Sequence, residues 1–418
     1  MLRKTLSSII IILLGILFSS SAFAVNAETK VKAKTPVKKV TKAPVKKTIK
    51  KTIVKTPIKP VVTPLLIAGW VPYWSKNAGG TETVENLSKL NIVSPFSYEV
   101  DGEGDVVDKL KIDSEPWPTL FNQAKSKNIK IYPTVTWFNR AQMQSTLNSE
   151  TSRSYHIGSI TAQILDNPNF DGVDIDYENK SAETKDGFSA FLRELSVVTK
   201  SKNKKLICTI EPRTPADSRF RELTPEKLAD SKIVSNDYTV IAKYCDQVRL
   251  LTYDQRDADI KLHDQFDKID APYMPVADPV WVEKVIKLAL QDIPANKIQL
   301  GIPTFGYKWE LTPDAEGKGY VYTKLRAVNF REAYNESKAR GIDLTRNQAG
   351  ELSYVYDAVG AQSFAGSTTT PKILVWFPDA ESMVDKINLA KKYKIGGVVV
   401  FKFDGGADQT MWDVLKQK

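Results

Sequence analysis

Residues 170–178 read Phe-Asp-Gly-Val-Asp-Ile-Asp-Tyr-Glu, the most informative stretch of this chain. In an extended strand, successive side chains point to opposite faces. Asp174, Asp176 and Glu178 therefore share one face, and the apolar side chains between them share the other. The pattern predicts a strand with three carboxyl groups on a single surface.

The acidic face points to proton chemistry if it is enclosed. When the apolar face packs under helices, the acids look into an interior where like charges do not all ionise, so at least one carboxyl keeps its proton at neutral pH. A proton held there can be delivered to a leaving group. The alternative is a half-exposed antiparallel strand with a solvated acidic face, which alternation alone also allows.

Strand-like runs alternate with amphipathic helical stretches along residues 65–418, which is the pattern of βα units around a parallel sheet. Eight such strands close a barrel, so the predicted fold class is α/β, a (β/α)8 barrel. The connection at about 309–372 is too long for a structureless loop, and it predicts a small α+β insertion before the eighth strand. The expected strands are 66–74, 92–100, 129–137, 170–178, 205–211, 247–254, 297–305 and 395–404.

The first 64 residues differ in composition from the rest. Residues 1–24 combine Arg3 and Lys4 with an apolar run and an Ala-Phe-Ala cleavage site, which predicts a signal peptide and a secreted or cell-wall-associated protein. An uncleaved membrane anchor is the alternative. Residues 25–64 are built from Lys, Pro, Thr and Val and predict a disordered linker.

Charge is concentrated in that same region. Residues 1–64 carry fourteen Lys or Arg against Glu28 alone, a net +13, and the whole chain is +10, so residues 65–418 sum to about −3. A globular part that is not basic argues against a nucleic-acid partner. The linker either attracts an acidic cell-wall polymer or is a solvated spacer without a partner.

The cysteines and histidines indicate neither a metal nor a cofactor. Cys208 and Cys245 lie at different heights when measured back from the ends of their strands, so we expect two buried thiols rather than a disulfide, even in an exported protein. His156 and His263 have no partner at metal-ligand spacing, which argues against a zinc site.

The residue patterns resemble one family. Residues 171–178 fit D-G-x-D-x-D-x-E, the motif on the fourth barrel strand of glycoside hydrolase family 18, the chitinase-like enzymes. Residues 251–254 are similar to the family's sixth-strand x-x-Tyr-Asp motif, and residues 297–307 resemble its seventh-strand K-x-x-x-G-x-P-x-x-G-Y. Within the family, residues 96–102 look closest to bacterial spore-cortex-lytic, cell-wall N-acetylglucosaminidase-type members.

The resemblance implies a substrate-assisted retaining mechanism without a cofactor. Glu178 would protonate the glycosidic oxygen while the 2-acetamido carbonyl of the substrate attacks the anomeric carbon, and Glu178 would then act as the base for water. Asp176 would hold the acetamido N–H, and Asp174 would hydrogen-bond Asp176. Tyr253 would donate its hydroxyl to the acetamido oxygen.

Further side chains at the strand ends are candidates for binding the substrate. Phe401 stands where the family commonly has a Trp under the subsite next to the cleaved bond. Arg213 meets an acidic substituent of the substrate or pairs with Glu211 or Asp217. Aromatic candidates either stack on sugar rings or pack in the core. These and the one acidic candidate are Trp74, Tyr98, Trp137, Trp309 and Asp254.

Two classes of function follow from these features. The first is a secreted monomeric glycosidase that cleaves β-linked N-acetylglucosamine-containing polysaccharide, either peptidoglycan or a chitin-like glycan. The second is a catalytically silent carbohydrate-binding protein on the same barrel, since family members that lose the acid become lectins. The retained Glu178 and Asp176 favour the first class. A third class, a structural protein anchored in the cell wall, rests only on the Lys-rich residues 30–59.

Overall fold

The computed structural model describes residues 64–102, 104–358 and 371–416. The expected signal peptide and all but the last residue of the expected linker lie outside the described residues. Within the described ranges, no helix has both the length and the apolar character needed to cross a membrane.

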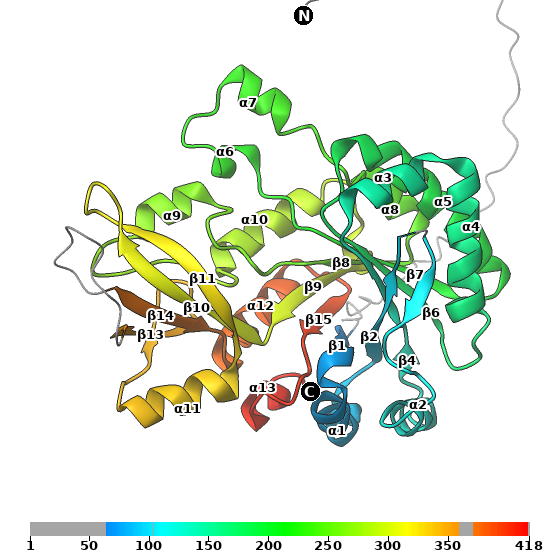
Figure 1. Ribbon diagram of the computed structural model, residues 1–418, viewed down its shortest axis with the longest axis horizontal. Coiled ribbons are helices and arrows are strands. Elements are labelled where there is room, and N and C mark those ends of the chain that lie inside the picture. The colour runs from blue at the N-terminus through cyan, green and yellow to red at the C-terminus, as the bar shows by residue number, and fades with distance from the viewer. Residues whose placement is uncertain (1–63, 103, 359–370, 417–418) are drawn as a thin grey trace, which may run out of the picture. The chain divides into compact units, whose positions relative to one another are not determined.

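Eight parallel strands close into a barrel, which confirms the predicted fold class (Figure 1). The ring is complete because the first strand pairs in parallel with both the second and the last. In order around the barrel the strands are β1 (Leu66–Pro72), β2 (Ile92–Val100), β5 (Thr134–Trp137), β6 (Gly172–Tyr177), β7 (Lys205–Ile210), β8 (Gln247–Leu250), β9 (Ile298–Pro303) and β15 (Gly397–Phe401).

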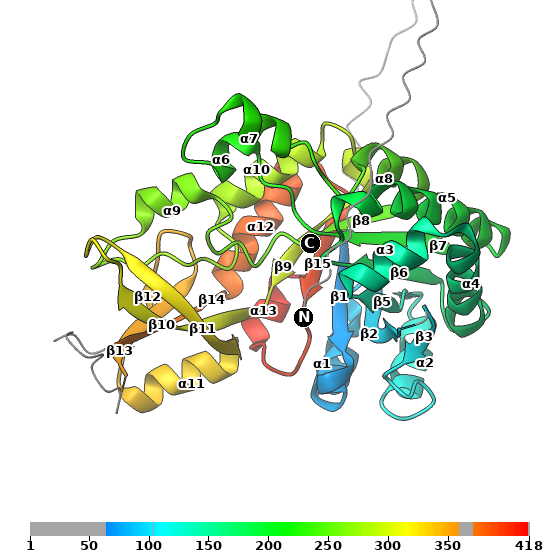
Figure 2. The same cartoon turned by 45° about the horizontal axis from the view of Figure 1, so that its top comes forward.

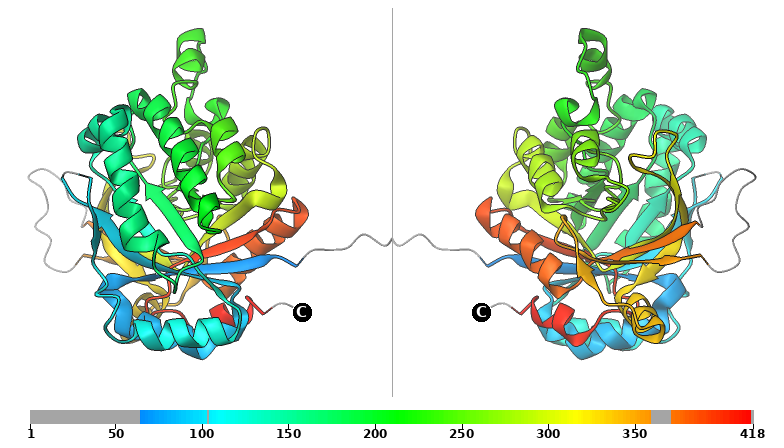
Figure 3. Two further views of the ribbon diagram at one scale, coloured as in Figure 1. Left: turned by 90° about the vertical axis from the view of Figure 1, so that its right-hand side faces the viewer. Right: turned by 90° about the vertical axis from the view of Figure 1, so that its left-hand side faces the viewer.

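Helices cover the outside of these strands (Figures 2 and 3). The longest of them, α5 (Lys185–Ser201), buries Phe188 and Phe191 against the outward face of β6, where Tyr177 stacks on Phe191 at 5.6 Å. The other helices outside the insertion are α1 (Lys76–Asn86), α2 (Trp117–Ser126), α3 (Arg140–Asn148), α4 (Glu150–Ile160), α6 (Ala216–Arg219), α7 (Pro225–Asp230), α8 (Tyr238–Tyr244), α9 (Ile260–Phe266), α10 (Pro279–Ala289), α12 (Ala380–Lys392) and α13 (Gln409–Asp413). Of these, α6 and α7 project away from the barrel (Figure 1).

Every barrel strand except β2 is shorter than the sequence pattern predicts, and two of the differences have a clear local cause. The expected strand 129–137 is divided into β4 (Lys130–Ile131) and β5, because Pro133 between them has no N–H for the ladder. A further short strand, β3 (Val106–Asp108), pairs with β2. Strand β8 ends at Leu250 because the Thr252 N–H bonds back to the Leu250 carbonyl instead of to a neighbouring strand.

The predicted α+β insertion is present between β9 and β15. Its antiparallel sheet contacts the loop before α10 through Glu351, a fully buried carboxyl that accepts hydrogen bonds from the backbone N–H groups of Val276 and Ala277 and from the Trp376 indole. The elements of the insertion are β10 (Phe305–Pro313), β11 (Tyr320–Asn329), α11 (Phe330–Arg340), β12 (Thr345–Arg346), β13 (Leu352–Asp357) and β14 (Lys372–Phe377).

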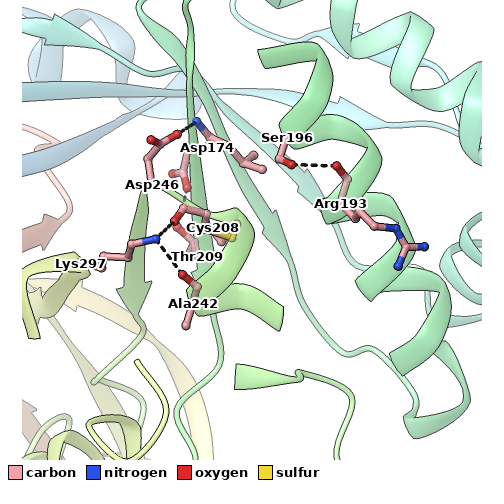
Figure 4. Close-up of a disulfide and its surroundings, with 10 residues drawn as sticks. Asp174, Arg193, Ser196, Cys208, Thr209, Ala242, Asp246 and Lys297 are labelled. Carbon is pink, nitrogen blue, oxygen red and sulfur yellow. Dashed lines mark hydrogen bonds between the residues drawn. A yellow bond between two sulfur atoms is a disulfide. The ribbon is translucent and has the colours of Figure 1, made fainter. Parts of the chain in front are cut away.

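The expectation of two free thiols is wrong. Cys208 and Cys245 form a disulfide across a Cα–Cα distance of 6.0 Å, well within bridging range (Figure 4). The expectation compared the positions of the two cysteines along their strands, but Cys245 is not part of a strand. It lies at the end of α8, just before β8, and the turn there brings it beside the outward-facing Cys208 of β7. Lys297 holds the helix end in place by donating to the carbonyls of Ala242 and Cys245.

Candidate active site

The inward face of β6 carries the acids in a row from the centre of the barrel toward its C-terminal mouth. Asp174 lies deepest and is fully buried. Its Oδ2 accepts hydrogen bonds from Trp70, Thr134 and Arg249, and its Oδ1 accepts one from Thr209 at 2.7 Å. Because both oxygens are satisfied from four different strands, Asp174 is a fixed negative charge at the base of the site.

Arg249 is the functional residue that sequence reasoning missed. Its guanidinium, also fully buried, lies 2.7 Å from the Asp174 carboxylate and donates hydrogen bonds to Gln299 on the neighbouring strand β9 and to Ser94 on β2, across the barrel. The signal was available, since Arg249 stands between the apolar residues Val248 and Leu250 of β8, and a buried Arg has to find an anion. Its partner could not be read from β8 itself, because the two charges are 75 residues apart.

Asp176 lies one step closer to the mouth and lacks a partner. The structure leaves its Oδ1 buried without a hydrogen bond from any described residue. Burial raises the pKa of Asp176 well above its ordinary value, and the charges of Glu178, Asp174 and Glu211 raise it further. A buried acceptor without a donor is costly unless something else supplies the N–H or O–H, so this oxygen marks a place where a ligand donor fits.

Glu178 follows β6 directly at the mouth of the barrel. Burial, together with the charges of Glu211 and Asp254, raises its pKa to about 7, while Lys180 acts in the opposite direction. No described residue hydrogen-bonds its carboxyl group. Glu178 is therefore a half-buried acid that is free to hold or release one proton near neutral pH.

The turn after Glu178 is held from three sides. Asn179 has a left-handed backbone with φ of 63°. Its N–H donates to Glu211 at 2.7 Å, and Arg140 donates to its backbone carbonyl and to its side-chain oxygen. Lys180 donates to the same Glu211 at 3.1 Å. These contacts fix the direction in which the Glu178 side chain leaves the strand.

Tyr253 completes the group around the acids. Burial and the charges of Asp176 and Glu178 raise its pKa well above the ordinary value, so its hydroxyl keeps its proton and can donate. Its ring stacks on Phe401 at 5.6 Å. A side chain at Gly301 would place its Cβ 2.9 Å from that ring, so this glycine makes the position of Tyr253 possible.

The next residue, Asp254, lies at the rim and accepts a hydrogen bond from the Tyr307 hydroxyl of β10. Its charge raises the pKa values of both Glu178 and Tyr253, which places it near the other acids. Phe305 of the same strand packs its ring against Tyr253 at 5.7 Å. The insertion sheet thus forms one side of the site.

The aromatic candidates separate by exposure. Trp74 is 50% exposed at the end of β1 and packs edge-on against Phe96, so one large ring at the mouth is available for stacking. Phe401 touches Trp70, Phe96, Tyr253 and Phe305 and forms the floor of the mouth. The rings that the structure buries are Tyr98, Trp137 and Trp309.

Trp137 does not face the acids. It pairs in register with Tyr177, whereas Thr134 and Thr136 pair with Asp174 and Asp176. The indole accordingly lies on the outer face of the barrel, against Tyr177 and His156 at 5.5 and 5.2 Å.

Arg213 has other partners than those considered from the sequence. Its guanidinium stacks on Tyr238 at 3.9 Å and donates to the Asn236 carbonyl. Glu211 is instead bound by Lys180, Asn179 and Asn236.

The comparisons with known proteins identify one family. The family model for glycosyl hydrolases family 18 matches residues 67–406, so the chain belongs to this family of glycosidases. It is 22% identical over 349 residues to the uncharacterized glycosylase YvbX of Bacillus subtilis, covering 81% of this chain and 89% of that protein. It is 24% identical over 341 residues to the cortical fragment-lytic enzyme of the same organism, covering 77% and 68%.

Solved structures share the fold. The spore cortex-lytic enzyme SleL of Bacillus megaterium superposes with a TM-score of 0.63 at 19% identity, covering 86% of this chain and 75% of that one. A family 18 chitinase from Cycas revoluta in complex with an N-acetylglucosamine trimer superposes with a TM-score of 0.61 at 17% identity, covering 84% and 98%.

Proposed function

We propose that this protein is a retaining glycosidase that cleaves β-linked N-acetylglucosamine-containing glycan by a substrate-assisted mechanism. The observation that carries the proposal is the buried, unpartnered Oδ1 of Asp176 next to an acid, Glu178, whose pKa is about 7. An acetamido group offers the N–H that this oxygen lacks, and a glycosidic oxygen needs the proton that Glu178 holds.

The reaction follows from these positions. Glu178 donates its proton to the glycosidic oxygen, so the bond to the leaving sugar breaks as the acetamido carbonyl oxygen attacks the anomeric carbon. Asp176 accepts the acetamido N–H and faces the positive charge that develops, while Tyr253 donates its hydroxyl to the acetamido oxygen. Glu178, now ionised, removes a proton from water as the water opens the ring intermediate, which restores the acid.

Asp174 supports this chemistry without touching the substrate. Its ion pair with Arg249 keeps a negative charge below Asp176, and this charge disfavours ionisation of Asp176. The arrangement keeps a proton on the carboxyls nearer the mouth of the barrel, where the leaving group needs it.

The test compares Glu178→Gln with the wild type on purified peptidoglycan and on chitooligosaccharides, with product masses as the readout. Loss of a general acid predicts a fall in turnover of about 10²–10⁴-fold. Glu381→Gln, at a 67% exposed side chain of α12, is the matched control and should act like the wild type. Near wild-type activity of the Glu178 variant, or equal cleavage of glucosides without a 2-acetamido group, would show the mechanism to be wrong.

We further propose export and retention at the cell wall. The support is the signal-like segment 1–24 and the twelve lysines of residues 30–59, which contain no acid. Binding of the protein to purified bacterial walls, with and without residues 25–64, should show a linker-dependent attraction that weakens between about 50 and 500 mM salt as screening shortens. Equal, salt-independent binding of both forms would assign the targeting to the barrel.

A further inference from the structure

Two cations lie over one aromatic ring at the edge of the site. Lys324 of β11 places its Nζ 4.1 Å from the centre of the Tyr307 ring, and the guanidinium of Arg256 lies 5.5 Å from the same centre. Tyr307 donates its hydroxyl to Asp254, the residue after Tyr253. The two positive charges are therefore next to the acids of the site.

Other cationic side chains on the insertion sheet form close ion pairs, whereas Lys324 and Arg256 do not. On the same sheet, Lys308 pairs with Glu336 and Arg326 pairs with Glu332. Among the described residues, Lys324 forms no ion pair and no hydrogen bond through its ammonium group.

Arg256 is only weakly paired. Its nearest carboxylate oxygen, on Asp254, is 3.9 Å away and already accepts from Tyr307. The Arg256 Nε is buried, and no described residue accepts a hydrogen bond from it. The carboxylate of Asp254 acts on both cations, so the cluster of these three charged side chains has a net charge of +1.

The energetics favour an additional anion. Burial and the charge of Arg256 lower the pKa of Lys324, while Asp254 raises it. The two cations therefore repel each other beside the Tyr307 ring, and an anion bound to both would remove this cost and give the Arg256 Nε an acceptor. A carboxylate matches the guanidinium fork and the ammonium group together.

A line of aromatic rings connects the two cations to the centre of the site. Phe401 packs against Phe305 at 5.8 Å, and Phe305 packs against Tyr307 at 5.6 Å. The cations over Tyr307 lie along this line on the insertion side of the mouth, two rings from Phe401. Asp254 links the two places, since its charge acts on Glu178 as well as on Lys324, so a sugar bound at Glu178 has its neighbouring substituents near the cations.

We infer that Arg256 and Lys324 form a subsite for a carboxylate carried by the glycan, which makes an N-acetylhexosamine polymer with acidic substituents the preferred substrate over a neutral one. The inference rests on the proposed function for the identity of the sugar. It assigns the anionic contact to these two residues and not to Arg213, which is occupied by Tyr238 and Asn236.

The experiment measures binding so that it does not depend on turnover. The full-length Glu178→Gln protein is titrated by calorimetry with a tetrasaccharide of alternating N-acetylglucosamine and N-acetylmuramic acid, once with free lactyl carboxylates and once with the same carboxylates converted to amides. One charge-assisted contact at a partly exposed site predicts about threefold to tenfold tighter binding of the acid form.

Lys324→Gln should remove most of this preference, Lys324→Arg should keep it, and Lys324→Glu should reverse it. Lys338→Gln is the matched control, because Lys338 stacks on Tyr334 of α11, outside the cluster, and its loss should leave the preference intact. The preference should also shrink between about 50 and 500 mM salt.

The outcomes separate the inference from the proposed function. Equal binding of acid and amide, or an unchanged preference in Lys324→Gln, would overturn the subsite even if the wild type cleaves both glycans. A preference that depends on Lys324, in a protein that cleaves neither glycan, would uphold the subsite and overturn the proposed hydrolysis. Binding of neither form would overturn both.

Discussion

Replacing Glu178 by Gln should make the protein more stable at neutral and alkaline pH while it lowers turnover by about 10²–10⁴-fold. The pKa of Glu178 is raised from 4.5 to about 7, chiefly by burial. A tenfold change in proton affinity is worth about 1.4 kcal/mol, so ionising this acid in the folded protein costs up to about 3 kcal/mol relative to the unfolded chain. Partial solvent access at the mouth reduces the expected value to about 1–3 kcal/mol.

The sign follows from proton linkage. The folded protein binds this proton more tightly than the unfolded chain does, so the stability of the wild type falls as pH rises from about 4.5 to about 7. Glutamine cannot ionise, and the variant escapes that loss. The difference in unfolding free energy between variant and wild type should therefore be constant below about pH 4.5, grow through the window, and level off above pH 7.

The assay is urea denaturation followed by tryptophan fluorescence at several values between pH 4 and pH 8. Glu211→Gln serves as the opposing control. Burial alone would raise the pKa of Glu211, but the contacts with Lys180 and Asn236 outweigh burial and lower the pKa. The ionised form of Glu211 therefore stabilises the fold, and this contribution is lost as pH falls. The Glu211 variant should be less stable than the wild type at neutral pH. A pH-independent difference for Glu178→Gln would refute the reasoning that this acid holds its proton near pH 7.

Three further predictions test the interior of the barrel. Asp176→Asn keeps the shape but removes the charge that faces the intermediate, so kcat should fall more than KM rises, and a pure KM effect in steady-state kinetics would limit Asp176 to binding. Arg249→Met leaves the buried Asp174 carboxylate unpaired and should destabilise the protein by about 3–5 kcal/mol in urea denaturation, a loss that added Asp174→Asn should partly reverse. Replacing Cys245 by Ala opens a covalent loop of 37 residues and should lower the unfolding free energy by about 3–4 kcal/mol under oxidising conditions, with no difference from the wild type once both proteins are reduced.

Local periodicity accounts for what the sequence predicted well. Alternation along 170–178 placed Asp174 and Asp176 on the inward face and Tyr177 under α5, because the two-residue repeat of a strand is a property of the backbone alone. The same repeat, counted from Thr134, assigns Trp137 to the outer face, so its position was also readable from its own strand. The eight strands and the insertion followed from the order of such local signals.

Pairings between distant segments needed the tertiary structure. The Arg249–Asp174 ion pair, the Cys208–Cys245 disulfide and the two cations over Tyr307 each join residues that lie on different elements. Their contacts depend on strand register, on the turn at the end of a helix and on how the insertion sheet meets the barrel. By itself, therefore, the sequence determined which side chains face inward and which acids share a surface, because those follow from the geometry of one strand. Only the closed barrel decided which charge neutralises which, and so which carboxyl is left with a proton, because burial and partners at long sequence separation set those energies.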